Sequence, residues 1–224
     1  MIVLSLGGSM INKPEGIDYE FLKEVTEIIK DSNEKFGIVT GGGFVAREYA
    51  KKAREKGASE FEADQEAIKG TWENAKYTIK ALGKIAAPKV FKDFNKAKNA
   101  LKKYKVVVMG GTIPGITTDS DSVLLAECIG AKKLINISNV DAIYDSDPRK
   151  NPNAKKFDNM THEQLIGLAV NSDKRTAGTN FVFDILACKL ALRSNIELHF
   201  VTGKKIDEIK NAIRGKEHSG TIVR

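Results

Sequence analysis

Short apolar runs alternate with longer segments of helical periodicity along the whole chain. In the short runs almost every position is apolar, whereas in the longer segments apolar residues recur every three or four positions. Strands that are buried on both faces carry the first pattern, which is typical of a parallel sheet covered by helices. The short runs predict six strands, over 2–6, 36–40, 87–91, 105–109, 133–138 and 197–201.

The longer segments between these strands predict helices. Strands that alternate with helices form βαβ units, so we expect an α/β fold: a three-layer αβα sandwich with a central, mostly parallel sheet. No linker divides the chain, and residues 1–224 are expected to form a single domain. The helices are predicted over 19–32, 44–57, 66–85, 121–131, 161–170, 180–194 and 205–215.

Composition narrows the class of protein. The 224 residues are 42% hydrophobic and 29% charged, which is typical of a globular chain large enough to bury a sizeable core. No apolar run approaches the roughly 18 residues that span a bilayer, and the first residues lack the basic start and long apolar core of a signal peptide. We therefore expect a cytoplasmic protein without a membrane partner.

The chain carries a net charge of +7. Its lysines are spread along the predicted helices and interleaved with glutamates, for example over 21–35 and 46–57, which is typical of solvated helix faces. Nucleic-acid binding is the alternative interpretation, but this interleaving does not favour it, and we expect no nucleic-acid partner. A mild positive field would still attract small polyanions such as nucleotides.

Cysteine and histidine do not indicate a metal site. Cys128 and Cys188 lie in apolar helical segments and are expected to be buried free thiols. The three histidines are scattered along the chain and match no ligand spacing, so we expect no metal site built from protein side chains.

Three of the predicted strands end in glycine clusters, at 7–8, 41–43 and 110–111. One such cluster could be a tight turn and nothing more. In an open parallel sheet, however, ligands bind outside the carboxyl ends of the strands, and all three clusters would lie along that edge. Glycine lets backbone N–H groups approach an anion closely, especially where a helix begins. The P-loop and dinucleotide-binding motifs are absent, so we expect a phosphate site assembled from several glycine turns.

Polar groups gather in the third of these connections, whose sequence from 109 to 121 is MGGTIPGITTDSD. Thr112, Thr117 and Thr118 supply hydroxyl groups. Asp119 is placed at the start of the next helix, where it could be an N-cap alone or could also order cationic groups or Mg²⁺ at the phosphates. Asp121 is expected to be a solvated carboxylate of the first helical turn.

Two further features fit a phosphate ligand with a base attached. Arg47 lies in the first turns of the helix after the second glycine cluster, from which its guanidinium could reach a phosphate. The segment 137–156 is too long and polar for an ordinary connection, and Tyr144 in it could cover a purine. The alternative is a turn-rich surface loop in which Asp145 and Asp147 only form turns.

Five stretches together resemble one family, the amino acid kinase superfamily, and within it the archaeal-type UMP kinases. They are LSLGGSM, TGGGFVAREY, MGGTIPGITTDSDSVLLAE, ISNVDAIYDSDPRKNPNAKK and AGTNFVFDILACKLA, in that order and spacing. The resemblance covers nearly the whole chain. It implies a kinase that converts ATP and UMP to ADP and UDP with Mg²⁺ in pyrimidine nucleotide biosynthesis. It also implies a homohexamer, with an acceptor-binding lobe over 1–130 and an ATP-binding lobe over 131–224.

The resemblance also implies residue roles. The catalytic residues would be Asp119, Asp184 and Arg47. The phosphates of ATP would be held by Gly8, Ser9, Gly43 and Arg47, and its nucleoside by Ser138, Asn139, Tyr144 and Asp147. The UMP site would be formed by Gly42, Asp64, Thr112, Ile113, Pro114, Gly115, Ile116, Thr117 and Thr118.

Several positions depart from the family pattern. Phe44 stands where many relatives carry a basic or amide residue, and Trp72 stands where they tend to carry arginine. The lysine that precedes the first glycine pair in many members is also missing, and Lys189 is a possible substitute. Two alternatives therefore stay open: another small-phosphate kinase of the superfamily, such as isopentenyl phosphate kinase, and a nucleotide-binding sensor without turnover.

Overall fold

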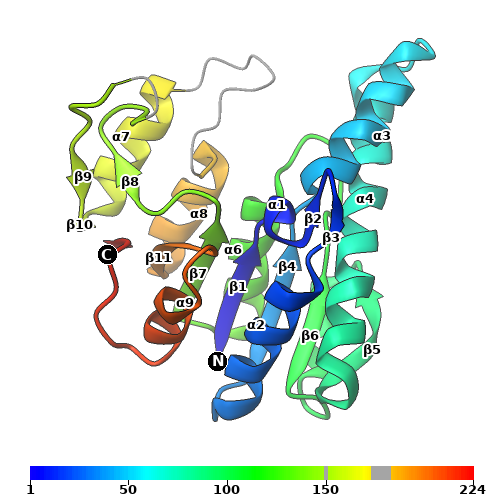
Figure 1. Ribbon diagram of the computed structural model, residues 1–224, viewed down its shortest axis with the longest axis horizontal. Coiled ribbons are helices and arrows are strands. Elements are labelled where there is room, and N and C mark those ends of the chain that lie inside the picture. Colours follow the sequence, from blue (N-terminus) through cyan, green and yellow to red (C-terminus); the bar gives the residue numbers. More distant parts are fainter. Residues whose placement is uncertain (149–150, 173–182) are drawn as a thin grey trace.

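An eight-stranded sheet forms the centre of the molecule (Figure 1). The structure is a computed structural model, and it describes residues 1–148, 151–172 and 183–224. The strand order is β10-β12-β11-β7-β1-β4-β6-β5, and the six strands from β11 to β5 run parallel to one another. These six strands are β1 (Ile2–Leu6), β4 (Phe36–Thr40), β5 (Ala86–Phe91), β6 (Val106–Met109), β7 (Lys133–Ser138) and β11 (Glu197–Thr202).

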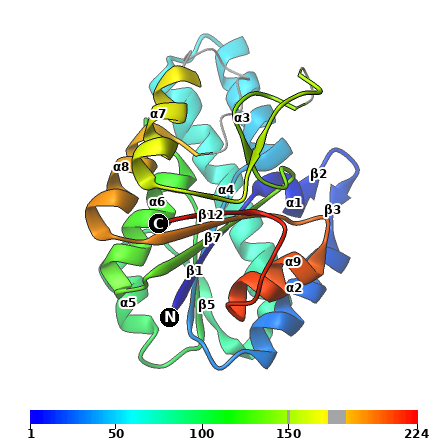
Figure 2. The same cartoon turned by 90° about the vertical axis from the view of Figure 1, so that its left-hand side faces the viewer.

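Helices cover both faces of this sheet, which confirms the predicted three-layer sandwich (Figure 2). One layer contains α2 (Tyr19–Asp31), α4 (Glu60–Leu82) and α9 (Ile206–Ile213). The other contains α5 (Phe94–Ala100), α6 (Thr118–Ile129), α7 (His162–Ser172) and α8 (Ile185–Ser194). Helix α3 (Gly43–Glu55) packs along α4.

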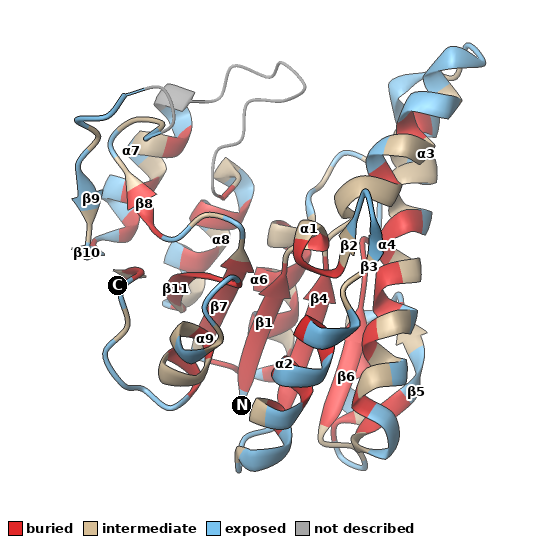
Figure 3. Ribbon diagram, in the orientation of Figure 1, coloured by how far each residue is buried: buried red, intermediate tan, exposed pale blue. Residues whose placement is uncertain are grey.

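The apolar strands are buried as their composition predicts, except β5 at the edge of the sheet, where Pro88 and Lys89 are exposed (Figure 3). In β1, Val3 packs into the core with α5 to α8, whereas Leu4 and Leu6 pack into the core with α2, α4 and α9. Successive side chains of a strand point to opposite faces, so a strand between two helical layers needs apolar residues throughout. The free thiol of Cys188 is buried as predicted, but Cys128 is partly exposed.

Three helix starts differ from the predictions. Helix α4 begins at Glu60, not at 66, because Ser59 and Glu62 form a capping box in which each side chain accepts the other's backbone N–H. Helix α6 begins at Thr118, and its N-cap is Thr117, not Asp119. Helix α8 begins at Ile185, and the part of its predicted range over 180–182 lies outside the described residues.

Short elements complete the fold, and the sequence predictions contain none of them. They include a hairpin, a three-residue 3-10 turn and two short strands at one edge of the sheet, of which β12 runs antiparallel to β11. The short elements are α1 (Gly8–Ile11), β2 (Asn12–Lys13), β3 (Gly16–Ile17), the turn Gly83–Ile85, β8 (Ile143–Tyr144), β9 (Lys156–Phe157), β10 (Asn159–Met160) and β12 (Thr221–Val223).

No helix among the described residues is both long and apolar enough to cross a membrane.

Candidate functional site

The first two glycine clusters interlock at the carboxyl edge of the sheet. A Cβ atom on Gly8 would collide with the backbone nitrogen of Gly43, and Gly43 itself has a φ of +60°. The Asn74 side chain on α4 holds the second cluster, because its Nδ2 donates to the carbonyl oxygens of Gly41 at 2.8 Å and Gly42 at 3.1 Å. Only glycine permits this approach of two backbones, so the turns predicted to meet at the phosphates of ATP do lie together.

The third glycine cluster lies against the same helix. The Gly111 N–H donates to Thr71 Oγ1 at 2.7 Å, and the Gly111 carbonyl accepts from Trp72 Nε1 at 2.9 Å. Further along, the Gly115 N–H donates to the Asp64 carboxylate at 3.0 Å. Of the residues predicted to bind UMP, those from Thr112 to Thr118 therefore form a loop that runs along α4, Asp64 lies on that helix, and Gly42 is the N-cap of α3. Ile113 projects outward from this loop and is 57% exposed.

Two of the predicted catalytic carboxylates are close enough to affect each other. Asp119 is partly buried in the first turn of α6, and its Oδ1 accepts from Ser5 Oγ and from Asn136 Nδ2, each at 3.0 Å. Loss of hydration, assisted by the nearby negative charge of Asp184, raises the pKa of Asp119 to about 7. A carboxylate in this state gains from any cation placed beside it.

Asp184 is the N-cap of α8, and its Oδ1 accepts from the Ala187 N–H at 3.0 Å. It also accepts hydrogen bonds from Thr117 Oγ1 and from Ser120 Oγ, the latter at 3.1 Å to each carboxylate oxygen. The starts of α6 and α8 are thus tied together through one carboxylate. This arrangement brings Asp119, Thr117 and Asp184 to one place.

The expectation that Asp121 is solvated is wrong. Asp121 is fully buried, and its two oxygens accept from the Thr112 N–H at 3.1 Å and the Thr112 hydroxyl at 2.6 Å. Burial raises the pKa of Asp121 to about 6. The Asp121 side chain points back along the loop and fixes Thr112 through these two hydrogen bonds. The sequence suggested only a surface charge at Asp121.

The cationic candidates remain at the surface. Arg47 is exposed on the second turn of α3, and Lys189 is exposed on α8. Phe44, at the position where many relatives carry a basic or amide residue, is partly buried. Of the two cations, Arg47 lies on the helix that starts at the interlocked glycines, so it has the shorter route to a phosphate there.

The residues predicted to hold the ATP nucleoside follow β7. The Gly7 N–H donates to the Ile137 carbonyl at 2.8 Å, so this connection begins beside the first glycine turn. Ser138 Oγ accepts from the Val140 N–H at 3.2 Å, and Asn139 is exposed. Tyr144 Oη donates to Asp141 at 3.2 Å, and burial is the main cause that raises its pKa. Asp147 lies further along the same connection.

Sequence reasoning missed Ser5, Asn136 and Ser120, which support the two carboxylates. Ser5 and Asn136 each carried a signal, because each is a polar residue inside an otherwise apolar strand. A buried polar group needs a hydrogen-bond partner, and that requirement points to a polar site at the strand. Ser120 offered no such signal in its helix.

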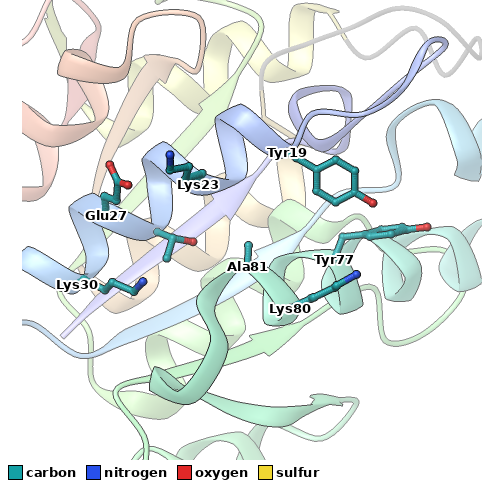
Figure 4. A pocket seen from close by; sticks show the side chains of 8 residues that line it. Tyr19, Lys23, Glu27, Lys30, Tyr77, Lys80 and Ala81 are labelled. Carbon is teal, nitrogen blue, oxygen red and sulfur yellow. The ribbon is translucent and has the colours of Figure 1, made fainter.

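A separate hollow lies between α2 and α4 (Figure 4). It shares no residue with the glycine turns or the carboxylates. Its lining is Tyr19, Lys23, Thr26, Glu27, Lys30, Tyr77, Lys80 and Ala81. The glycine clusters and the two aspartates define the candidate site instead, at the carboxyl edge of the sheet. There α3 and α4 stand on one side and α7, β8 and β9 on the other (Figure 1).

Comparison with known proteins places this site in a family context. The model of the amino acid kinase family matches residues 1–202. The chain is similar to the uridylate kinase of Thermococcus gammatolerans, with 44% identity over 224 residues that cover 99% of this chain and 98% of the relative. It is also similar to the uridylate kinase of Archaeoglobus fulgidus, with 43% identity over 222 residues that cover 99% of each chain.

Solved structures agree with these sequence matches. The crystal structure of uridylate kinase from Archaeoglobus fulgidus superposes with a TM-score of 0.86 at 40% identity, covering 100% of this chain and 99% of that one. The UMP kinase from Bacillus anthracis superposes with a TM-score of 0.82 at 22% identity, covering 100% and 95%. The second match supports the fold alone.

Proposed function

The chain belongs to the amino acid kinase family, and we propose that it transfers the γ-phosphoryl group of ATP to UMP, giving ADP and UDP. The observation that carries this proposal is the loop over 110–118, which is held along α4 and ends beside Asp119 and Asp184. The full-length similarity to uridylate kinases supports the same acceptor. The product would enter pyrimidine nucleotide biosynthesis.

Phosphoryl transfer asks the protein for position and charge stabilisation and needs little covalent chemistry. On the donor side, the proposal assigns the phosphates of ATP to Gly8, Ser9, Gly43 and Arg47. The interlocked glycine backbones can present N–H groups to phosphate oxygens, and the Arg47 guanidinium can neutralise charge there. We assign the nucleoside to Ser138, Asn139, Tyr144 and Asp147, whose connection starts beside the first glycine turn.

On the acceptor side, the proposal assigns UMP to Gly42, Asp64 and the loop from Thr112 to Thr118. This loop is fixed by residues on α4 and α6 before any ligand arrives, because Asp64 holds Gly115 and Asp121 holds Thr112. Such a loop can align the attacking phosphate oxygen with the γ-phosphorus of ATP at little further entropic cost.

Asp119 and Asp184 lie where the two substrates would meet. The Asp119 oxygen that accepts from Ser5 and Asn136 is held in place, and its other oxygen could receive a cationic group. Asp184 ties the starts of α6 and α8 together. We propose that Asp119 orders positive charge at the transferred phosphoryl group and that Asp184 positions Asp119 and the loop.

The proposed cofactor is Mg²⁺ that enters with ATP. No group of three or more potential ligands from histidine, cysteine, aspartate and glutamate occurs among the described residues. Mg²⁺ usually binds through one or two carboxylates together with substrate phosphates and water, and Asp119 fits that smaller role. When bound, the ion neutralises phosphate charge.

We extend the proposal to the organisation of the protein. Acceptor binding is assigned to 1–130 and ATP binding to 131–224, together with the phosphate-holding turns of the first part. The protein is proposed to be a cytoplasmic homo-oligomer, a hexamer by family resemblance. Sedimentation of the purified chain tests the assembly, and a monomer at working concentration would contradict it.

The direct test is ADP release with ATP, Mg²⁺ and a panel of acceptors: UMP, CMP, AMP, GMP and isopentenyl phosphate. We expect the highest kcat/KM with UMP. Absence of ADP with UMP would contradict the proposal. A preference for isopentenyl phosphate would favour the other small-phosphate kinase, and tight nucleotide binding without product would favour the sensor.

A further inference from the structure

The backbone of Gly111 is held on both sides by two neighbouring residues of α4. Its N–H donates to Thr71 Oγ1 at 2.7 Å, and its carbonyl oxygen accepts from Trp72 Nε1 at 2.9 Å. The next residue, Thr112, is held by Asp121 through both its N–H and its hydroxyl. The entry to the acceptor loop is therefore held by the side chains of Thr71, Trp72 and Asp121.

Gly110 shows how closely this loop approaches α4. A Cβ atom added there would lie 2.8 Å from Trp72 Cδ1 and would overlap Thr71 Oγ1. The loop backbone thus rests directly on the indole ring. A ring in this position sets the distance between α4 and the loop, while its N–H sets the direction of the Gly111 carbonyl.

A cation lies over the indole ring. Lys92 Nζ lies 3.2 Å from the centroid of the Trp72 ring. Lys92 directly follows β5, so it stands at the same carboxyl edge of the sheet as the glycine clusters. A lysine ammonium over a tryptophan face is an attractive contact, and it restricts the ring to the orientation in which its N–H meets Gly111.

We propose that Trp72 is a positioning residue for the acceptor loop and that Lys92 keeps its indole ring in place. Trp72 acts through Gly111 on the residues that receive the acceptor, so it governs acceptor binding more than ATP binding. The inference rests on the proposed function in one respect, namely that this loop receives the phosphate acceptor.

The first experiment compares Trp72→Phe with the wild type. Phenylalanine keeps a ring between Lys92 and the loop but removes the donor to the Gly111 carbonyl. We expect KM for UMP to rise about three- to tenfold, which corresponds to the loss of one hydrogen bond at ~1.4 kcal/mol per tenfold. KM for ATP and kcat should change less than twofold. A purely structural role would lower Tm without this split, and an unchanged KM for UMP overturns the proposal.

Tyr49→Phe is the matched control. Tyr49 Oη donates to Glu73 on α4 at 2.7 Å, so this variant also removes one aromatic hydrogen bond to α4, but it does not touch the loop. We expect its KM for UMP to match the wild type. An equal rise of KM in both variants would show that any loosening of α4 suffices, and it would overturn the assignment to Trp72.

A double-mutant cycle tests the role of Lys92. Lys92→Met keeps an unbranched side chain over the ring but removes the charge, and we expect KM for UMP to rise about two- to threefold. Because Lys92 acts through the indole N–H, this effect should vanish in the Trp72→Phe background. Effects that multiply independently would contradict the arrangement.

The indole also reports on the loop directly, because Trp72 is the only tryptophan of the chain. UMP added without ATP should shift or quench the tryptophan emission, and ATP alone should not. If UMP leaves the emission unchanged while the enzyme turns over, the indole does not sense the acceptor and the proposal fails. Should the wild type use another phosphate acceptor, the same variants are compared with that acceptor, so this result would overturn only the choice of UMP.

Discussion

The two sides of the candidate site are built in different ways. On the acceptor side, side chains reach across long sequence separations: Thr71 and Trp72 hold Gly111, and Asp64 holds Gly115. On the side assigned to the ATP nucleoside, the side chains of Ser138 and Tyr144 form hydrogen bonds, among the described residues, only with Val140 and Asp141, two and three positions away. Residues distant in sequence hold the acceptor loop, whereas the side chains of Ser138 and Tyr144 are held by residues of their own segment.

This difference has a physical consequence for binding. A preformed loop has already lost its conformational entropy, so an acceptor that matches it binds at little further cost and one that does not is rejected. Side chains with local partners can exchange them for a ligand at small cost to the fold. We therefore expect substitutions on the acceptor side to change KM for UMP and those of the side chains assigned to the ATP nucleoside to have milder effects.

The largest effect is expected where the two sides meet, in Asp119→Asn. The amide keeps the size of the side chain but cannot supply negative charge to a cationic group at the transferred phosphoryl. We expect kcat to fall by roughly 10²–10³, the typical loss for one preorganised electrostatic contact. Asp207→Asn, on the exposed first turn of α9, is the control. Near-normal kcat in Asp119→Asn would show that the carboxylate is not part of the reaction centre.

Asp119 also predicts a pH dependence of stability in the absence of Mg²⁺ and nucleotide. Its folded-state pKa is raised from 3.8 to about 7, so the folded protein holds the proton more tightly than the unfolded chain does. Proton binding to Asp119 therefore stabilises the folded wild type at low pH, and this contribution to the free energy of unfolding should be lost as the pH rises from about 4 to 7. Asp119→Asn should melt higher than the wild type at pH 8 by at least about 2 °C, and the gain should shrink at pH 5. Equal gains at both pH values would contradict the raised pKa.

The interlocked glycines should be the most sensitive backbone position. In Gly8→Ala the new methyl group would meet the backbone of Gly43, which cannot rotate away as a side chain could. We expect a loss of about 1–3 kcal/mol in the free energy of unfolding and a higher KM for ATP. Gly167→Ala in α7, where a Cβ meets nothing within 4 Å, serves as the control and should melt at or above the wild-type temperature. Similar melting of both variants would rule out the close approach.

Asp64 tests how much of acceptor binding depends on the preformed loop. Asp64→Ala removes the acceptor of the Gly115 N–H, a hydrogen bond to a charged group worth about 1.5–3 kcal/mol. We expect KM for UMP to rise about tenfold or more, with KM for ATP nearly constant. Glu66→Ala on the same helix removes a carboxylate that pairs with the exposed Lys69 and should behave as the wild type. A matching rise in KM for ATP would remove the distinction between the two sides.

The central sheet was predictable because burial on both faces forces nearly every strand residue to be apolar. The strands β10 and β12, the outer two at one end of the sheet, span only two and three residues, which is too short for a periodic pattern. The start of α4 was visible in principle, since Ser59 and Glu62 match the capping-box spacing. Its first turns carry few apolar residues, so periodicity alone placed the start six residues late.

The candidate site likewise has features that the sequence predicts and contacts that it does not predict. Glycine clusters at strand ends could be predicted, because close backbone approach leaves a mark in the sequence. Links such as Thr117 to Asp184, or Trp72 to Gly111, join residues 67 and 39 positions apart and leave no local mark. The same reason explains the error at Asp121, because a carboxylate in a first helical turn looks the same whether its partner is water or Thr112.

The smallest effect is expected on the donor side, in Tyr144→Phe. Within the part of the chain that the structure describes, the hydroxyl group is hydrogen-bonded only to the nearby Asp141, so its loss should leave Tm within about 1 °C and KM for ATP within twofold. Tyr144→Ala removes the ring as well, and because a stacked aromatic pair contributes about 0.5–1.5 kcal/mol, KM for ATP should rise roughly three- to tenfold while KM for UMP stays constant. Melting curves and initial rates with each substrate varied in turn provide both measurements. A Tyr144→Phe effect as large as that of Asp64→Ala would mean that the hydroxyl is as firmly built into the site as the acceptor loop, and the contrast between the two sides would disappear.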